Sequence, residues 1–124
     1  MEKKKRPKIT RGETHRVTTG CGNLYVTPSW DDDGNLIEVF AVLGRAGSCA
    51  KCQLEALTRA ISLGLKYGIP VSEYINELRG IICPKTGWDE GVHILSCPDA
   101  VAKILEKTKG GSDAGRDNST DKIS

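Results

Sequence analysis

The stretch that decides the fold is Gly-Arg-Ala-Gly-Ser-Cys-Ala-Lys-Cys-Gln, residues 44–53, with the helix that it begins. Ser48 is a favourable N-cap residue, because its hydroxyl can accept a hydrogen bond from an unpaired N–H of the first helical turn. Apolar residues then recur at helical spacing, at Leu54, Leu57, Ile61 and Leu65. Gly68 offers the left-handed conformation that ends many helices. Since this is the longest periodic segment of the chain, we expect the hydrophobic core to form on its apolar side.

The sequence before this helix predicts three antiparallel strands. Residues 14–19, 23–27 and 35–43 are rich in β-branched, aromatic and alternating apolar side chains. A Gly-Cys-Gly turn at 20–22 separates the first two strands, and an Asp-Gly turn at 33–34 precedes the third.

Two further helices are predicted after the central one. Pro70 opens the first, which we expect to end near Arg79, before Gly80. Ser96 and Asp99 form a capping box that begins the last helix, which we expect to run to about Lys107. The predicted fold class is therefore α+β: a three-stranded antiparallel meander followed by three helices, with a cysteine cluster at one end.

Five cysteines carry the chemistry that the sequence offers. Cys49 and Cys52 lie in the predicted first turn of the central helix, where free N–H groups and the helix dipole favour a thiolate. Cys21, Cys83 and Cys97 each stand beside Gly or Pro at the predicted end of another element. An odd number of cysteines argues against a disulfide framework, and leaves metal ligands, redox groups or small core residues.

The two ends of the chain differ in composition from the middle. Residues 1–11 form a basic arm, for which we expect a solvated tail or a contact with phosphate or an acidic partner. Residues 109–124 lack periodicity and are expected to be disordered. Residues 12–108 remain as the folded domain. The sequence has no apolar run typical of a membrane span or an export signal, so we expect a cytoplasmic protein with reduced thiols.

Several segments, in this order, resemble the TSCPD domain. That domain forms a C-terminal part of adenosylcobalamin-dependent (class II) ribonucleotide reductases and also occurs alone. The similar segments are Thr-Gly-Cys-Gly-Asn-Leu-Tyr-Val-Thr at 19–27, Leu-Gly-Arg-Ala-Gly-Ser-Cys-Ala at 43–50, Cys-Pro at 83–84 and Leu-Ser-Cys-Pro-Asp-Ala-Val-Ala-Lys at 95–103. The resemblance extends over residues 6–107.

The resemblance implies metal binding by four cysteines, which are Cys21, Cys49, Cys83 and Cys97. Four thiolates complete a tetrahedral shell and leave no open position for catalysis, so the metal expected is zinc. Cys52 is extra to the family's pattern, and we expect it to be a further thiol that binds no metal.

The resemblance also bears on activity. In the reductases, substrate and cobalamin belong to a large barrel domain, for which this chain has no room. We therefore expect a domain that is not catalytic alone. It would be accessory to a separate ribonucleotide reductase polypeptide in DNA precursor synthesis, and cobalamin would bind only to that partner.

Two other functions stay open, as does a homo-oligomer. The strands and the Gly-x-Cys before a helix are similar to iron–sulfur scaffold proteins of the IscU type. In that case Cys21, Cys49 and Cys97 would hold a labile cluster or receive sulfur, with help from Cys83. A nucleic-acid-binding module that uses the basic arm is the other alternative, although the chain has few aromatic side chains on which bases could stack.

Overall fold

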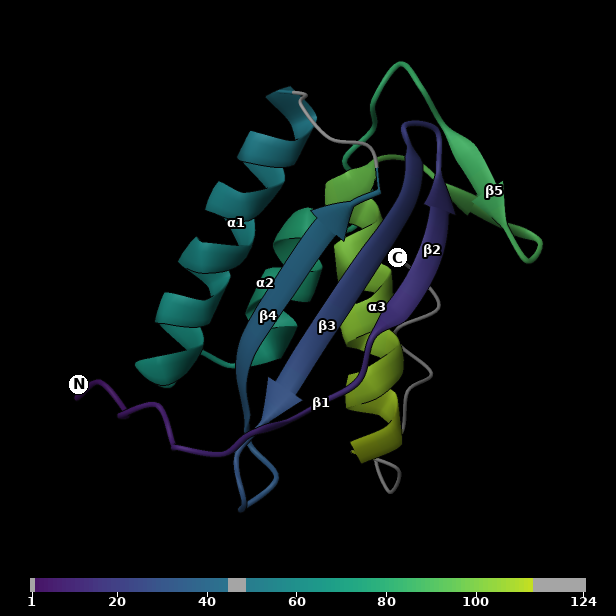
Figure 1. Cartoon of the computed structure of the whole chain (residues 1–124). Helices are drawn as coiled ribbons and strands as arrows, with labels where there is room; N and C mark the ends of the chain where they lie inside the picture. Colours follow the sequence, from purple (N-terminus) through teal and green to yellow (C-terminus); the bar gives the residue numbers. More distant parts are fainter. Residues whose placement is uncertain (1, 45–48, 113–124) are drawn as a thin grey trace.

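The computed structural model describes residues 2–44 and 49–112 of the chain. It is an α+β fold in which three helices accompany two antiparallel sheets (Figure 1). The elements are β1 (Arg11–Gly12), β2 (His15–Thr19), β3 (Gly22–Trp30), β4 (Leu36–Leu43), α1 (Cys49–Lys66), α2 (Val71–Leu78), β5 (Gly87–Asp89), β6 (Val92–Ile94) and α3 (Cys97–Ser112). No helix among the described residues is long and apolar enough to cross a membrane.

β3 is the central strand of the larger sheet. β4 pairs along one side of β3, and β1 and β2 pair with successive stretches of its other side, all antiparallel. β2, β3 and β4 correspond to the three strands that the sequence predicts. The predicted count is nevertheless too low, because β1 joins this sheet and β5 and β6 form a separate hairpin. These extra strands have two or three residues each, too few for a periodic pattern to reveal them.

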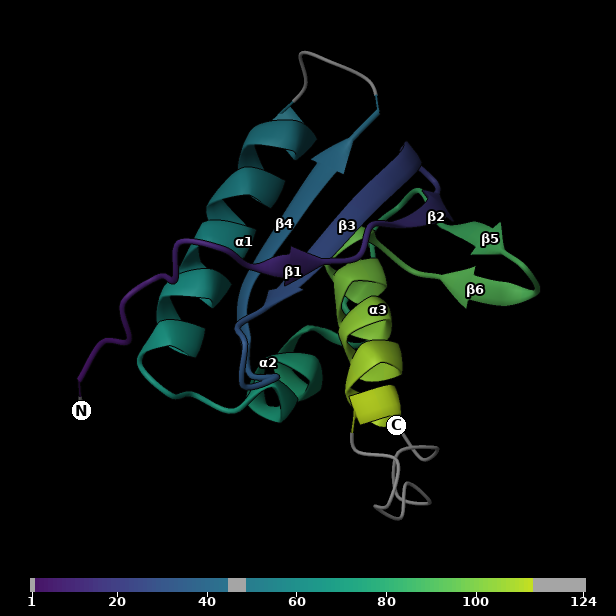
Figure 2. The ribbon, with the colours of Figure 1, turned by 60° about the horizontal axis from the view of Figure 1, so that its bottom comes forward.

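The core lies between the sheet and the helices. Figures 1 and 2 show α1 alongside β4, with α2 and α3 together on one side of the sheet. Apolar residues of every long element meet there, among them Leu24, Val26, Val39, Leu54, Ile61, Ile75, Val101 and Leu105. The predicted apolar stripe of α1 is confirmed, since Leu54, Ile61 and Leu65 are buried and Leu57 is partly buried against them.

The helix ends agree with the sequence except at the end of the chain. Pro70 occupies the N-cap position of α2, whereas the predicted N-cap Ser48 lies outside the described residues. α3 continues to Ser112, past the end that the sequence predicts near Lys107, and the expected disorder of residues 109–124 stays a prediction. Residues 113–124 lie outside the described part.

On each long edge of the larger sheet, a side chain of the same protein forms hydrogen bonds with the strand backbone. On β4, the Ser62 hydroxyl of α1 accepts from the Val39 N–H at 2.9 Å and donates to the Val39 carbonyl at 3.1 Å. On β2, the Thr18 N–H donates to the Asp89 carboxylate at 2.9 Å. Each edge therefore has backbone groups that are satisfied by a neighbouring element of the same chain.

Candidate functional site

Three of the four cysteines predicted as ligands line one pocket of about 360 Å³, which we call the cysteine pocket. Cys21 comes from the turn between β2 and β3, Cys83 from the segment after α2, and Cys97 from the start of α3. Figure 1 shows this turn and the starts of α1 and α3 at the same end of the molecule. The other lining residues are mostly apolar: Ala50, Gln53, Leu54, Leu57, Leu78, Ile81, Ser96 and Pro98.

The other two cysteines lie beside this pocket and do not line it. Cys49 and Cys52 are exposed in the first turn of α1. Their neighbours Ala50 and Gln53, in the same turn, do reach the pocket wall. In the described part of the chain, no three His, Cys, Asp or Glu side chains are arranged to hold a metal ion. The structure thus brings Cys21, Cys83 and Cys97 to one pocket and leaves Cys49 outside its wall, next to Ala50.

The surroundings of Cys97, including the two other pocket thiols, change its pKa. Burial raises the pKa of Cys97, and the Thr19 hydroxyl, 4.0 Å from its sulfur, partly opposes that rise. The neighbouring thiols of Cys21 and Cys83 raise the pKa of Cys97 further. Without a cation, the pocket therefore favours the neutral thiol of Cys97. A bound metal ion would reverse this preference, because metal coordination deprotonates a thiol.

A buried carboxylate holds two of the cysteine-bearing segments together. Asp99 of α3 is fully buried, and its two oxygens accept from the Gly80 N–H at 2.9 Å and the Leu95 N–H at 3.0 Å. It also forms an ion pair with Lys103. Burial alone would raise the pKa of Asp99, but the Lys103 ammonium and the two backbone N–H groups hold it below its usual value. The carboxylate therefore stays ionised and joins the segment after α2 to the start of α3.

The predicted capping box is only half formed. Ser96 accepts from the Asp99 N–H at 3.0 Å, as expected. Asp99, however, reaches back to the N–H of Leu95 and not to that of Ser96. Its other oxygen accepts a hydrogen bond from the Gly80 N–H. Gly80 belongs to a segment that the local sequence pattern could not indicate.

Further hydrogen bonds fix Cys83 beside the start of α3. The Ser96 hydroxyl donates to the Ile81 carbonyl at 2.6 Å, and the Cys83 N–H donates to the Leu95 carbonyl at 2.9 Å. The Lys85 N–H points at the Cys83 sulfur, 3.5 Å away. Backbone N–H groups directed at sulfur are a common support for thiolates in metal sites.

A close backbone contact between Gly20 and Gly87 fixes the position of the turn that carries Cys21. A Cβ atom at Gly20 would lie 2.2 Å from the Lys85 carbonyl oxygen, and one at Gly87 would lie 2.8 Å from the Gly20 nitrogen. Only glycine allows the backbones of these two segments to approach so closely. The sequence showed Gly20 as a turn residue, but its role in joining distant segments depends on tertiary structure.

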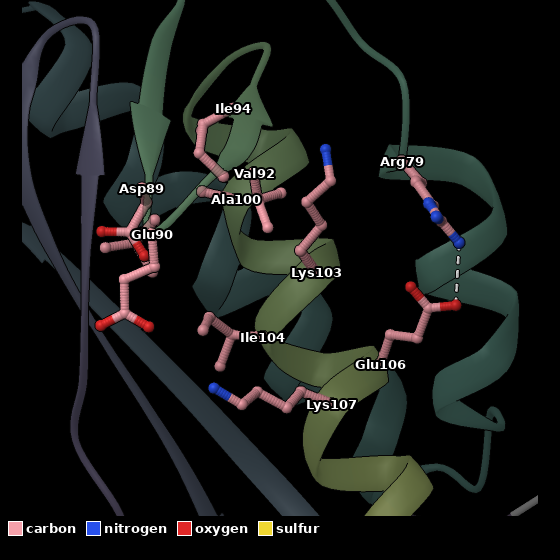
Figure 3. A pocket seen from close by; sticks show the side chains of 11 residues that line it. Arg79, Asp89, Glu90, Val92, Ile94, Ala100, Lys103, Ile104, Glu106 and Lys107 are labelled. Atoms are coloured by element: carbon pink, nitrogen blue, oxygen red, sulfur yellow. Dashed lines mark hydrogen bonds and ion pairs between the residues drawn. The ribbon is translucent and has the colours of Figure 1, made fainter. Parts of the chain in front are cut away.

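A second pocket, of about 410 Å³, lies on α3 beside the β5–β6 hairpin (Figure 3). Acidic and basic side chains border it in equal number: Arg79, Lys103, Lys107, Asp89, Glu90 and Glu106. Arg79 pairs with Glu106 at 2.8 Å, and the Lys103 ammonium also donates to the His93 carbonyl at 3.2 Å. No cysteine lines this pocket, so the sulfur chemistry belongs to the cysteine pocket.

Comparison with known proteins identifies the family. The family model described as the TSCPD domain matches residues 1–109. The chain belongs to the TSCPD family. This finding confirms the resemblance that the cysteine-containing segments suggest.

The relatives of this TSCPD domain are regions of much longer proteins. It is 37% identical, over 106 residues, to vitamin B12-dependent ribonucleotide reductases of Streptomyces avermitilis and Streptantibioticus cattleyicolor. Those matches cover 85% of this chain and 11% and 18% of the respective relatives. The corresponding reductase of Bradyrhizobium diazoefficiens is 32% identical over 75 residues, which are 60% of this chain and 6% of that protein. No solved structure matches this chain.

Replacing Gly20 by Ala should separate Cys21 from Cys83. The new methyl group would overlap the Lys85 carbonyl, so the Gly20→Ala variant should lose about 1–3 kcal/mol of unfolding free energy. Gly44→Ala is the matched control, because its Cβ would be 3.4 Å from the nearest atom, an ordinary contact. Urea denaturation followed by circular dichroism measures both. Equal stability of the two variants would contradict the glycine contact.

Replacing Asp99 by Asn should weaken the junction at the start of α3. One of the two backbone N–H groups would face an amide NH₂ group, and Lys103 would lose its counter-charge, so we expect a loss of about 3 kcal/mol near neutral pH.

The loss should depend on pH with a definite sign. The lowered pKa of Asp99 stabilises the folded state above about pH 4, the value for an unfolded aspartate. As the pH falls through the folded-state pKa, this contribution disappears and the parent should approach Asp99→Asn in stability. Asp32→Asn, in an exposed turn, is the control. A stability difference between parent and Asp99→Asn that is constant down to pH 2 would contradict the assignment.

Proposed function

We propose that this TSCPD domain binds one zinc ion through Cys21, Cys49, Cys83 and Cys97. The observation that carries the proposal is the convergence of three of these thiols, from three separate segments, on the cysteine pocket. Cys49 is the fourth ligand, since the first turn of α1 already lines the pocket through Ala50. Binding would require the sulfurs to draw closer around the ion than they lie in the described structure.

The chemistry of the pocket favours zinc. Among the described residues, its potential ligands are sulfur atoms, with no carboxylate or imidazole in the wall. An all-thiolate set suits zinc or an iron–sulfur centre and does not suit magnesium or calcium. Zinc with four thiolates has no open position, so its role would be structural: it would join the β2–β3 turn, the start of α1, the segment after α2 and the start of α3.

A labile cluster of the IscU type has less support. Such a scaffold combines three cysteines with an acidic residue at an exposed site. Asp99 is the acidic residue near Cys97 in sequence, but it is fully buried and its oxygens are occupied by Gly80, Leu95 and Lys103. We therefore keep the cluster as an outcome of the test.

The relatives suggest the setting in which the domain acts. We propose an accessory role beside a vitamin B12-dependent ribonucleotide reductase, because the relatives carry that name. The chain spans between 6% and 18% of these relatives. In this proposal, the reduction of ribonucleotides and the binding of cobalamin belong to a catalytic partner and not to the residues of this chain. The TSCPD domain would contribute a rigid, metal-stabilised surface.

Metal analysis tests the zinc site. Protein purified without a metal-chelating tag should contain about one zinc per chain by mass spectrometry and should have no visible colour. Cys83→Ser should lower the zinc content and the melting temperature together, because the ion joins several elements. Cys52→Ser is the matched control and should keep both.

Two results would contradict the zinc proposal. Iron with sulfide and a brown absorbance would favour the cluster. Protein without metal, with five titratable thiols, would make the cysteines core or redox residues.

A reconstitution experiment tests the accessory role. A vitamin B12-dependent reductase from which the matching region has been deleted should form deoxyribonucleotides faster when this chain is added. The zinc-depleted Cys83→Ser variant should give less stimulation, and Cys52→Ser should match the parent. If the parent chain has no effect and does not co-elute with the truncated reductase, the accessory role is wrong.

A further inference from the structure

A third pocket lies at the opposite end of α1 from the cysteine pocket. The basic arm lies beside the last turn of the helix (Figure 1), and together they form a pocket of about 400 Å³. Its described lining is entirely cationic: Lys3, Lys4, Lys5, Arg6 and Lys66. We call it the basic pocket.

The arm is fastened in place by specific bonds. The Lys4 N–H donates to the Lys66 carbonyl at 2.7 Å, and the Lys4 ammonium lies 3.7 Å from the Asp31 carboxylate. Arg6 donates to Glu38 at 2.7 Å, and Lys66 donates to the same Glu38 oxygen at 3.0 Å. The expected solvated tail is thus tied to α1, to β4 and to the β3–β4 turn, although most of its side chains are exposed.

Glu38 concentrates positive charge at this point. Its side chain is only 5% exposed. Burial would raise its pKa, but hydrogen bonds from Arg6 and Lys66 hold the pKa below the usual value. An ionised Glu38 therefore keeps two cations side by side at the pocket wall.

The pocket keeps an excess of positive charge after these pairings. Asp31 and Glu38 oppose Lys4, Arg6 and Lys66, whereas Lys3 and Lys5 have no acidic partner among the described residues. Five cations thus face two carboxylates in a concave site. Phosphate oxygens are the natural complement, because ammonium and guanidinium groups form short, charge-assisted hydrogen bonds with them.

We propose that the basic pocket binds an oligophosphate group, such as inorganic tripolyphosphate or the phosphates of a nucleotide. The compact, concave arrangement of the five cations suits a short phosphate chain better than an extended nucleic acid. No aromatic side chain lines the pocket in the described part, so the site recognises phosphate and not a stacked base. This inference is independent of zinc, since it uses no cysteine.

Isothermal titration of the full chain with tripolyphosphate tests the site. The double variant Lys3→Gln, Lys5→Gln should bind about tenfold more weakly, because two exposed charge contacts are lost, and its melting temperature should not change. The control is Arg16→Gln, Lys107→Gln, which removes the same charge from exposed positions outside the basic pocket and should bind like the parent. Binding by the parent should weaken as salt is added.

Three results would overturn the proposal. The first is the absence of tripolyphosphate binding by the parent. The second is an equal loss of affinity in both double variants, which would indicate attraction by net charge alone. The third is tight binding of a single-stranded oligonucleotide with none of tripolyphosphate, which would make the arm a nucleic-acid contact. In a parallel titration, ATP should bind no more tightly than tripolyphosphate, because the site recognises the phosphate chain alone; tighter binding of ATP would contradict this.

Discussion

The arrangement of the cysteine pocket depends on the buried carboxylate of Asp99. It accepts hydrogen bonds from Gly80 and Leu95, which belong to segments far apart in the sequence. These bonds hold the segment after α2, which carries Cys83, against the start of α3, which carries Cys97. A buried charge is costly unless it is fully paired, and the Lys103 ammonium supplies the pairing. The pocket geometry therefore rests on an interaction that contains no sulfur.

Buried carboxylates thus organise both ends of the molecule. Asp99 aligns the backbone around a sulfur-lined pocket, and Glu38 gathers cations around a basic one. α1 connects the two, because its first turn borders the cysteines and its last residue, Lys66, borders the arm. The proposed zinc site and the proposed phosphate site therefore share one rigid helix and no ligand, so that each can be tested without disturbing the other.

The sequence predicts the larger helices and strands better than the contacts between them. Helical periodicity reveals α1, and the Gly or Pro beside Cys21, Cys83 and Cys97 indicates the element ends that meet at the pocket. The capping-box pattern identifies Asp99, yet only its local half is correct, because its contact with Gly80 spans nineteen residues. The apposition of Gly20 and Gly87 and the pairing of β1 likewise arise from tertiary structure. Local patterns carry no information about such partners.

The hydrogen bonds between the Ser62 hydroxyl of α1 and the backbone of β4 have a consequence for assembly. An exposed strand edge can recruit a strand from another chain, whether a binding partner or an aggregating copy. Here Ser62 occupies the backbone groups of Val39, and Asp89 occupies the N–H of Thr18 on the other edge. A strand from another chain could therefore not pair at Val39 or Thr18 without displacing Ser62 or Asp89, which opposes β-strand addition at these two positions.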